Sequence, residues 1–472
     1  MTDRLKHNLL AVIFILGYSS LCFELILLRQ LVNFVGSNAL ITSIVIAVVL
    51  LFMCVGYYIG STVSVRKFPL REIIEKVVFI LSFWYVFASS YYLLGGFFYV
   101  MAQADIVRPT LQVSLVSILL AAAPSVALGF ITSYFGRIIH HTDSDYTGRF
   151  MAVDTLGGVS GSLLTTLFFM PLWGVMSAVS ALVFLNSSIL VLMSKRKDFY
   201  CNILVCLIFC AMALVVSNER LWNKDSRLMV DNAIARLEIF DTDFVDGKPQ
   251  SAEMIINGSS SSKISEKQEL MYPYIDYINT NFIANLPETK VNDVLILGAG
   301  GFTIGLDDVR NNYVFLDVIW QLPEISEKHF LHQPLTENKK FIAQDAYLFM
   351  LNDAHKYDLI VVDLYSSRQS IPVNFVTLDF FKMVKNHLKP NGIMAANIIT
   401  SPAFKTKYSQ RIDNTLRKVF PHSLSRQVLP SPETSVFNPY TDDMRNILYV
   451  YYNGHDDDEI YTVNKNSAVF GQ

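Results

Sequence analysis

The sequence predicts a multi-pass α-helical membrane domain followed by an α/β Rossmann-like domain, with a small β unit at the start of the latter. Three observations favour this fold class. Residues 1–217 contain long apolar stretches, and residues 218–472 hold most of the charged side chains. In addition, the glycine-rich turn Gly298-Ala299-Gly300-Gly301 directly follows the apolar segment Val294–Leu297. The change in composition near residue 217 therefore separates a lipid-embedded part from a part that folds in water.

Seven segments are long and apolar enough to be predicted as transmembrane helices. A hydrocarbon core about 30 Å thick requires roughly 20 apolar residues per helix. The first segment lacks a clear small-residue cleavage site and further spans follow it, so we interpret it as a retained span and not as a signal peptide. The predicted spans are 8–28, 39–61, 77–101, 111–135, 151–171, 174–194 and 199–217.

Composition excludes several classes of function. The chain has 472 residues and a net charge of −3, which gives no reason to expect a nucleic acid partner. Its 5 cysteines all lie in the predicted spans, and no Cys/His spacing typical of a metal site is present. We therefore expect neither a disulfide framework nor a bound metal.

The distribution of Lys and Arg between loops predicts the topology. Basic residues occur before the first span and after the second, fourth and sixth spans. By the positive-inside rule the N-terminus is cytoplasmic, and seven spans would place residues 218–472 outside the cytoplasm. A cytosolic nucleoside co-substrate would instead require a cytoplasmic domain. The prediction is a multi-pass protein of the bacterial inner (plasma) membrane, with the side of the soluble domain left open.

Three ionisable residues lie within or at the ends of predicted spans: Glu24, Arg29 and Asp154. Such residues are costly in lipid and are functional-site hypotheses by default. The alternative, which we favour, is structural pairing between helices. Glu24 and Arg29 are five positions apart, about 140° around a helix, so they do not pair well within it. Small residues of the fifth span predict a face for close helix packing: Gly157, Gly158, Gly161 and Ser162.

Strands and helices alternate along the soluble part. Segments 235–240 and 251–256 alternate with period two, as half-buried strands do, and predict a small β unit within 218–290. A helix at 266–285 links this unit to a Rossmann-like domain at 291–454, and residues 455–472 form a polar tail. In that domain, alternation and strands apolar on both faces predict a parallel sheet covered by helices. The predicted strands are 294–297, 313–318, 340–343, 359–363, 393–398 and the closing apolar run 447–452; the helices are 323–331, 345–353, 377–388 and 404–419.

Acidic residues occur at three successive strand ends of this sheet: Asp317, Asp345 and Asp363. Open α/β sheets bind ligands at the carboxyl ends of their strands, and an acid after the second strand can accept hydrogen bonds from both ribose hydroxyls. The preceding glycine turn lets a ligand approach the backbone. We therefore predict a nucleoside site. The alternative for each acid is a helix N-cap, which suits Asp345 best.

Taken together, the motifs resemble the membrane-bound spermidine synthase-like family, in which an aminopropyltransferase fold is fused to a multi-pass membrane domain. Phe23–Arg29 resembles its Tyr-Glu-x-x-x-x-Arg segment, and Tyr146–Gly158 resembles its Gly-Arg…Asn-Thr-Leu-Gly segment with Asp154 in place of Asn. Leu297–Thr303, and Asp363–Ser366 with Ile371-Pro372, carry the match in the soluble part. The resemblance implies the Rossmann fold of the methyltransferase/spermidine synthase type.

The resemblance also implies roles for individual residues. Gly298 and Gly300 would approach the sulfonium nucleoside, Asp317 would bind its ribose, and Asp345 the adenine amino group. In the family's arrangement Asp363 would stand at the junction with the amine acceptor, and Tyr272 would line the acceptor site. The co-substrate would be decarboxylated S-adenosylmethionine or S-adenosylmethionine, without a metal.

The sequence departs from the soluble members of this family at several positions. The aspartate that would deprotonate the attacking amine is replaced by Ser366, and Glu269 and Asp276 are candidates to substitute for it. The other departures are Gly301 in place of an aspartate of the glycine turn, Ile319 in place of a second acid, Tyr272-Pro273-Tyr274 in place of Tyr-His-Glu, and Ala235 in place of glutamine.

The predicted function is a membrane-bound transferase that moves an aminopropyl group from an adenosyl sulfonium donor to an amine. The alternatives are an S-adenosylmethionine-dependent methyltransferase and a non-catalytic membrane scaffold or transporter-like protein with a degenerate nucleoside-binding domain. The expected partners are the lipid bilayer and a small-molecule amine or a membrane-delivered acceptor. Whether the chain forms a homo-oligomer stays open.

Overall fold

The computed structural model describes residues 3–36, 39–63, 70–106, 108–142, 146–218, 225–265, 267, 269, 272–365, 371–422, 424–429 and 445–454. The chain divides into two compact units, Met1–Glu238 and Ile239–Gln472. The division lies later in the chain than the composition boundary predicted at residue 217. The reason is that the first strand of the small β unit packs against the helices, mainly through α7. The predicted polar tail lies outside the described residues.

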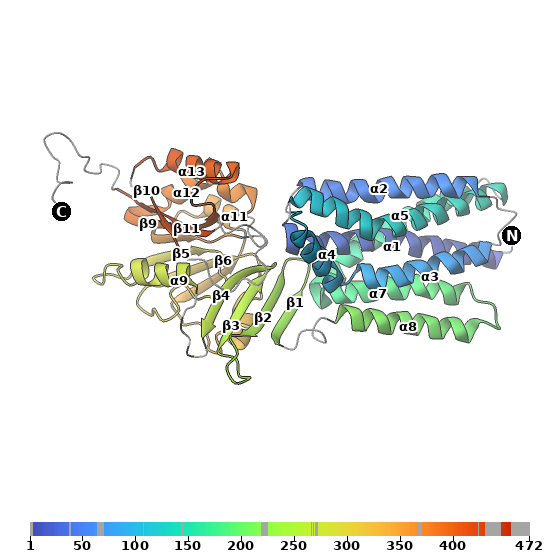
Figure 1. Cartoon of the computed structure of the whole chain (residues 1–472), viewed down its shortest axis with the longest axis horizontal. Helices are drawn as coiled ribbons and strands as arrows, with labels where there is room; N and C mark the ends of the chain where they lie inside the picture. Colours follow the sequence, from blue (N-terminus) through green and yellow to red (C-terminus); the bar gives the residue numbers. More distant parts are fainter. Residues whose placement is uncertain are drawn as a thin grey trace. The chain divides into compact units, whose positions relative to one another are not determined.

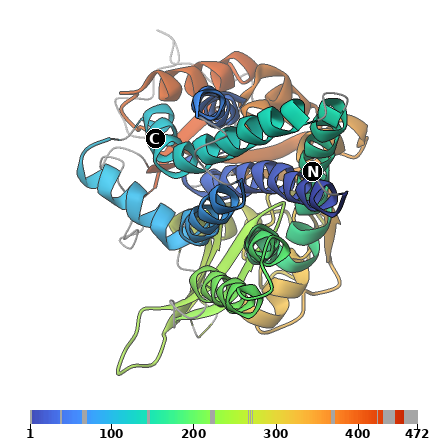
Figure 2. The ribbon, with the colours of Figure 1, turned by 90° about the vertical axis from the view of Figure 1, so that its right-hand side faces the viewer.

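The first unit is a bundle of long helices. Within it α2 packs along α5 and α7 along α8 (Figure 1), and α1 packs along α6. Figure 2, viewed from the side of the N-terminus, shows α1 between the α2–α5 pair and the α7–α8 pair. The helices are α1 Asp3–Val35, α2 Ala39–Thr62, α3 Leu70–Ala88, α4 Tyr91–Gln103, α5 Pro109–Thr142, α6 Tyr146–Leu164, the π-helical turn η1 Thr165–Phe169, α7 Met170–Leu192 and α8 Phe199–Ser217.

Five described helical stretches are long and apolar enough to cross a membrane, and the bent α3–α4 pair would be a sixth. The longest, Tyr146–Leu192, has 47 residues, about 70 Å of helix, which is more than twice the thickness of a hydrocarbon core. It is interrupted at Gly174, whose φ of 80° and ψ of 173° are not helical. If the segments on both sides of Gly174 cross separately, the bundle makes the seven crossings predicted from the sequence. That number stays a prediction.

The predicted span 77–101 is not one straight helix. It divides at Ser89 and Ser90, where α3 and α4 meet at an angle of 65°. Ser90 caps α4 because its Oγ accepts a hydrogen bond from Leu93 N at 3.4 Å, and such serine bonds compete with a continuous helix. Gln30 of α1 donates to the carbonyl of Ser89 at 2.6 Å. The carbonyl of Ser89 at the break therefore has a hydrogen-bond donor inside the bundle, as a membrane environment requires.

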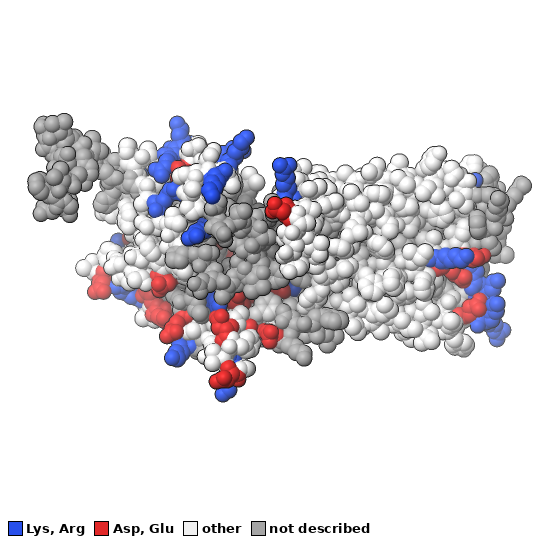
Figure 3. All heavy atoms as spheres, in the orientation of Figure 1, with Lys and Arg blue, Asp and Glu red and all other residues white. Residues whose placement is uncertain are grey.

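Small residues let neighbouring helices approach closely. A Cβ atom on Gly157 would lie 2.2 Å from the carbonyl oxygen of Phe14, and one on Gly161 would lie 2.3 Å from that of Tyr18. The predicted packing face of α6 is therefore confirmed, with α1 as its partner. Figure 3 shows a broad uncharged surface over these helices, with charged side chains gathered at their ends, as expected for a lipid-facing surface.

The strands form two sheets. A four-stranded sheet has the order β1-β2-β3-β4, with β1 Ser226–Asp231, β2 Arg236–Thr242, β3 Ser251–Ile256 and β4 Ser259–Ser265. A seven-stranded sheet has the order β10-β11-β9-β8-β5-β6-β7. Its strands are β5 Asp293–Leu297, β6 Asn312–Asp317, β7 Lys339–Ala343, β8 Tyr357–Val362, β9 Leu388–Thr400, β10 Leu424–Val428 and β11 Arg445–Tyr452.

The larger sheet is mixed, whereas the sequence predicted a parallel one. Strands β5 to β9 are parallel, but β11 runs antiparallel to β9 and β10 antiparallel to β11. Strand β10 was not predicted because its sequence, Leu-Ser-Arg-Gln-Val, is short and largely polar. Such a sequence is compatible with its position at the edge of the sheet. The five parallel strands with their crossover helices confirm the Rossmann-like fold of the methyltransferase/spermidine synthase type.

Helices α11, α12 and α13 cover one face of this sheet through a common apolar core with the central strands. The predicted helix at 266–285 is shorter among the described residues and begins at Pro273, which occupies the first helical position. The helices of this unit are α9 Pro273–Ile278, η3 Asn279–Ile283, α10 Leu322–Ile325, η4 Ser326–Phe330, α11 Ala346–Asn352, η5 Val373–Val376, α12 Leu378–Asn386 and α13 Lys407–Val419.

Candidate functional site

The carboxyl ends of the parallel strands meet at one edge of the sheet. β5 lies between β6 and β8, so the glycine turn after β5 has Asp317 on one side and Asp363 on the other. Backbone hydrogen bonds fix this junction: Gly298 N donates to Leu316 O at 2.9 Å, and Asp363 N donates to Leu297 O at 2.8 Å. Gly298, Asp317 and Asp363 are therefore held together by the backbone.

The glycine turn has a conformation and surroundings that require glycine. Gly298 has a φ of +97°, and a Cβ atom there would lie 2.0 Å from the carbonyl oxygen of Asp363. Gly300 has a φ of +50°, and its Cβ would lie 2.8 Å from Ser261 Oγ. Neither position tolerates a side chain without rearrangement. The turn thus exposes bare backbone between the two acids, which suits close approach of a ligand.

Asp317 is oriented by the backbone around it. Its Oδ2 accepts a hydrogen bond from Ala299 N at 3.2 Å, and its Oδ1 accepts one from Ile319 N at 3.0 Å. Burial raises the pKa of this carboxyl to about 6, although the backbone N–H groups partly oppose the shift. Each carboxylate oxygen keeps a second lone pair, so Asp317 can accept hydrogen bonds from a vicinal diol such as that of ribose.

Asp345 serves as the N-cap of α11. Its Oδ1 accepts a hydrogen bond from Leu348 N at 3.0 Å. The capping alternative considered for this residue is therefore confirmed. Contact of the same carboxyl group with an adenine amino group stays a prediction.

Asp363 is held by two neutral donors that the sequence analysis missed. Tyr274 Oη donates to its Oδ2 at 2.9 Å, and Asn397 Nδ2 donates to its Oδ1 at 2.9 Å. Burial raises the pKa of Asp363 to about 6, and these two hydrogen bonds oppose the shift. One signal was available, because Asn397 is a polar residue at the carboxyl end of the apolar strand β9.

Tyr272 binds a different acid from the one that Tyr274 binds. Its hydroxyl donates to Glu253 Oε1 at 2.6 Å, and its ring stacks on Tyr274 with centroids 6.3 Å apart and planes 22° apart. Tyr272 therefore continues the chain of contacts from Asp363 through Tyr274 to Glu253. Glu253, on β3, was not among the predicted site residues, because nothing in its strand marks it as more than one polar position of an alternating pattern.

The predicted substitutes for the missing aspartate do not reach this cluster. Glu269 is exposed, and its Oε2 accepts from Ser265 Oγ at 3.3 Å. Asp276 is also exposed, on α9, and its carboxylate lies 3.5 Å from Thr280 Oγ1. Ser366 itself lies outside the described residues. Among the described residues, the acids that accept hydrogen bonds from the hydroxyls of the stacked tyrosines are Asp363 and Glu253.

Three further departures from the family pattern lie at buried positions, and the one at Gly301 has a steric explanation. A Cβ atom on Gly301 would lie 2.5 Å from Phe330 Cε1 and 2.9 Å from Ser262 Cβ, so the aspartate found there in soluble members does not fit. Ile319 is buried in place of the second acid, and Ala235 is buried in a turn of the helical unit. There, Ala235 N donates to Asn232 Oδ1 at 3.0 Å.

The three ionisable residues of the predicted spans, Glu24, Arg29 and Asp154, have different surroundings in the structure. Arg29 forms an ion pair with Asp231 of β1 at 2.8 Å, and its Nε donates to the carbonyl of Asn232 at 2.6 Å. Its partner is thus a strand residue and not Glu24, as expected from their angular separation. Glu24 is half-buried in α1, and Asp154 lies in α6 against Gly17. Structural pairing accounts for Arg29, while the roles of Glu24 and Asp154 stay predictions.

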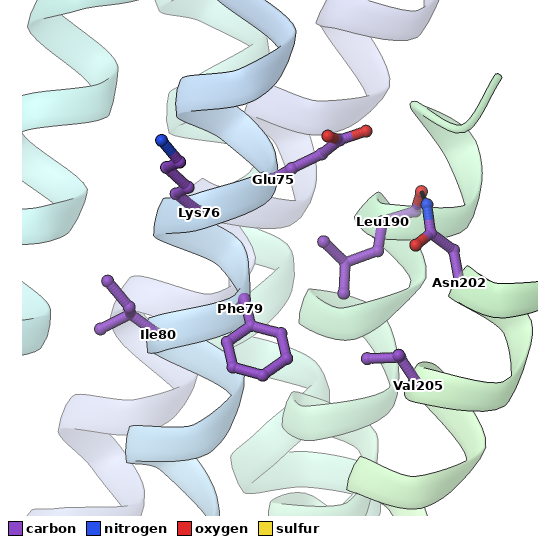
Figure 4. Close-up of a pocket in the computed structure, with 7 residues that line it drawn as sticks. All are labelled: Glu75, Lys76, Phe79, Ile80, Leu190, Asn202 and Val205. Atoms are coloured by element: carbon purple, nitrogen blue, oxygen red, sulfur yellow. Dashed lines mark hydrogen bonds between the residues drawn. The ribbon is translucent and has the colours of Figure 1, made fainter. Parts of the chain in front are cut away.

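A groove of about 390 Å³ lies on the helical unit between α3, α7 and α8 (Figure 4). Its two charged residues are already paired, Glu75 with Arg71 at 2.6 Å and Lys76 with Glu72 at 2.7 Å. It contains no residue predicted to take part in function. The residues that line it are Glu75, Lys76, Phe79, Ile80, Leu190, Asn202 and Val205.

The fold is that of a Rossmann-like α/β domain with acids at its strand ends, and known proteins similar to the chain specify its type. Residues 322–436 match the family model of the Spermine/spermidine synthase domain. Polyamine aminopropyltransferase 2 of Aquifex aeolicus is 23% identical, over 81% of this chain and 77% of its own length. Polyamine aminopropyltransferase of Oceanobacillus iheyensis is 25% identical, over 76% and 72%. The resemblance predicted from the motifs is confirmed: the C-terminal part of the chain carries a spermidine synthase domain.

Solved structures of two spermidine synthases are also similar to this chain. A probable spermidine synthase from Corynebacterium glutamicum has 20% sequence identity and a TM-score of 0.39, covering 52% of this chain and 84% of that protein. Spermidine synthase from Thermotoga maritima has 15% identity and a TM-score of 0.37, covering 51% and 77%. The two curated relatives above align over more of the chain than residues 218–472 make up, so their similarity includes part of the helical unit.

Proposed function

We propose that this protein is a membrane-bound transferase that binds an adenosyl sulfonium donor and transfers its aminopropyl group to an amine. The observation that carries the proposal is the junction of the glycine turn with Asp317 and Asp363, one acid on each side of bare backbone. The names of the relatives, which are polyamine aminopropyltransferases, support the same reaction class.

In the proposed complex the nucleoside lies along the glycine turn. Asp317 accepts hydrogen bonds from the ribose hydroxyls, and its own bonds to Ala299 N and Ile319 N hold it in position before the ligand arrives. Asp345, at the end of the next strand, is placed to meet the adenine ring. The donor is decarboxylated S-adenosylmethionine, and no metal takes part.

The transfer step is a nucleophilic substitution. The lone pair of a neutral amine forms an N–C bond to the carbon next to the sulfonium, and the C–S bond breaks with its electrons going to sulfur. The products are a neutral thioether, methylthioadenosine, and the alkylated amine in its protonated form. Alkylamines titrate near roughly 10, so the acceptor arrives protonated near neutral pH, and a base must remove one proton from it before its lone pair can attack. With its pKa near 6, Asp363 is ionised there and receives this proton.

The helical unit supports a membrane location for the proposed enzyme. Its described helices have the length and apolarity of membrane spans, and basic residues occur on alternate loops. We infer a multi-pass protein of the bacterial inner membrane whose acceptor is a small-molecule amine or an amine delivered from the bilayer.

Methyl transfer from S-adenosylmethionine is a second candidate. The observation that favours it is the surroundings of Gly300 and Gly301, where the hydroxyl groups of Ser261 and Ser262 lie in place of a carboxylate. Hydroxyl groups accept a donor with an amino acid tail as readily as one with an aminopropyl tail.

The test is product analysis with the detergent-purified chain. Decarboxylated S-adenosylmethionine and a mixture of aliphatic amines should release methylthioadenosine together with an aminopropylated amine. Asp363→Asn should lower the rate by roughly 10²–10⁴-fold, as expected for loss of a general base. Asp307→Asn, at an exposed acid of the same unit, should leave it unchanged. Release of S-adenosylhomocysteine from S-adenosylmethionine would support methyl transfer instead, and no product from either donor would contradict both reactions.

A further inference from the structure

The groove between α3, α7 and α8 changes from polar to apolar along its length. Glu75 of α3 and Asn202 of α8 line one end of it (Figure 4). Phe79 of α3 and Val205 of α8 line it about one helical turn further along. The change occurs at a matching position on both helices, as it would at the boundary between lipid headgroups and hydrocarbon.

The polar end of the groove has more positive than negative side chains. It is bordered by the start of α3 and by the connection from α7 to α8. Glu75, the acid that lines the groove, is neutralised by Arg71, whose Nε donates to it at 2.6 Å. Three consecutive basic residues are exposed in the connection: Lys195, Arg196 and Lys197. In the two segments together, basic residues outnumber acids, with Arg71, Lys76, Lys195, Arg196 and Lys197 against Glu72, Glu75 and Asp198. This end therefore attracts an anion.

Aromatic residues indicate the depth of this end in the bilayer. Tyr200, in the first turn of α8, is 81% exposed, and its ring meets that of Phe199 edge-on with centroids 5.7 Å apart. Exposed tyrosines beside basic residues gather where a helix passes from hydrocarbon to headgroups. The positive-inside rule assigns this end to the cytoplasmic side, where the leaflet contains anionic lipids.

The apolar part of the groove continues along α8. A second groove of about 310 Å³ is lined by apolar residues of this helix: Ile208, Ala211, Met212, Val215 and Val216. Val205, Met212 and Val216 are seven and four positions apart and so share one side of α8. Between Val205 and Val216 the helix rises about 16 Å, close to half of a hydrocarbon core of about 30 Å. The apolar stripe is thus as long as the acyl region of one leaflet.

We propose that this groove binds one anionic phospholipid, with its phosphate at the basic connection between α7 and α8 and an acyl chain along the apolar stripe of α8. Basic pockets between helices on the cytoplasmic side are suited to such headgroups, and each Lys or Arg near the surface adds attraction. A zwitterionic lipid would cover the apolar stripe equally well but has no net charge for the basic end. The inference goes beyond the proposed reaction and rests on the proposed membrane location.

Native mass spectrometry of the full chain in detergent tests the headgroup end. The chain is titrated with dioleoyl phosphatidylglycerol or with dioleoyl phosphatidylcholine, and we expect the first phosphatidylglycerol to bind at least about tenfold more tightly. Arg196→Gln should weaken this binding about fivefold, the effect of one basic side chain at a membrane surface. Arg108→Gln removes the same charge from an exposed position just before α5, at the other end of the helices, and should leave the affinity unchanged.

A second pair of variants tests the acyl end. Val205→Trp fills the groove and should remove the tight phosphatidylglycerol site, whereas Leu204→Trp adds the same ring at the neighbouring exposed position of α8 and should keep it. Equal affinities for the two lipids in the wild type, or a phosphatidylglycerol preference that is unchanged in Arg196→Gln, would overturn the inference. A chain that stays in solution without detergent would instead contradict the membrane location, and the inference with it.

Discussion

The donor and acceptor halves of the candidate site are built in different ways. The donor half consists of backbone: a glycine turn with positive φ angles, strand ends joined by peptide hydrogen bonds, and one acid oriented by two N–H groups. The acceptor half consists of side chains from separate elements, with Asp363 of the β8 end held by Tyr274 of α9 and Asn397 of β9. A backbone site leaves a contiguous motif in the sequence, whereas a side-chain site leaves scattered single residues.

The largest effect should come from removing the acid of the donor half. Asp317→Ala should weaken the binding of methylthioadenosine at least about a hundredfold, because two hydrogen bonds to a charged group are lost. Calorimetric titration measures this affinity. Asp307→Ala, at an exposed acid, is the matched control. An unchanged affinity of Asp317→Ala would show that the donor half lies elsewhere.

The next largest effect tests whether the donor half depends on backbone shape. Gly298→Ala should reduce both nucleoside affinity and the temperature of thermal unfolding, since its Cβ would collide with the Asp363 carbonyl. Gly247→Ala shares the positive φ but meets no atom within 4 Å, so it isolates the conformational cost of about 1 kcal/mol. If both variants lose nucleoside affinity and thermal stability equally, the close approach of Gly298 to the Asp363 carbonyl does not contribute to either quantity.

A smaller effect should distinguish the two halves. Tyr274→Phe removes the hydroxyl that binds Asp363 Oδ2 but leaves the glycine turn intact. We expect kcat/KM for the amine to fall about tenfold, a typical value for one hydrogen bond to a charged group, with nucleoside affinity unchanged. Loss of nucleoside affinity in this variant would show that the two halves are not separable.

The smallest change should come from varying pH. Because burial raises the pKa of Asp317 to about 6, its carboxyl is ionised above that pH and protonated below it. The ionised form accepts ribose hydroxyl bonds better, so affinity for methylthioadenosine should be full above pH 7 and fall as pH decreases through about 6. Titrations between pH 5 and 8 measure this, and Asp363→Asn should keep the same profile. Affinity that rises towards acid pH would contradict the role of Asp317.

The same contrast explains how much could be predicted from the sequence. The apolar spans, the alternation of strands and helices, and the glycine turn with its strand-end acids are local patterns, and they indicated the fold and the donor half. The bend at Ser89-Ser90 depends on Gln30 from another helix, and the antiparallel β10 has too few apolar residues to be noticed. Tyr274, Asn397 and Glu253 become site candidates only when β3, α9 and β9 come together, which no spacing in the sequence reports.

The most direct test of the account is calorimetric titration of the detergent-purified chain with methylthioadenosine, decarboxylated S-adenosylmethionine and S-adenosylmethionine. A preformed donor half predicts that methylthioadenosine binds, because it carries the nucleoside that the glycine turn and Asp317 contact. Tighter binding of the decarboxylated donor would support aminopropyl transfer, and preference for S-adenosylmethionine would support methyl transfer. Absence of binding by all three compounds would contradict the nucleoside site and favour a non-catalytic membrane scaffold.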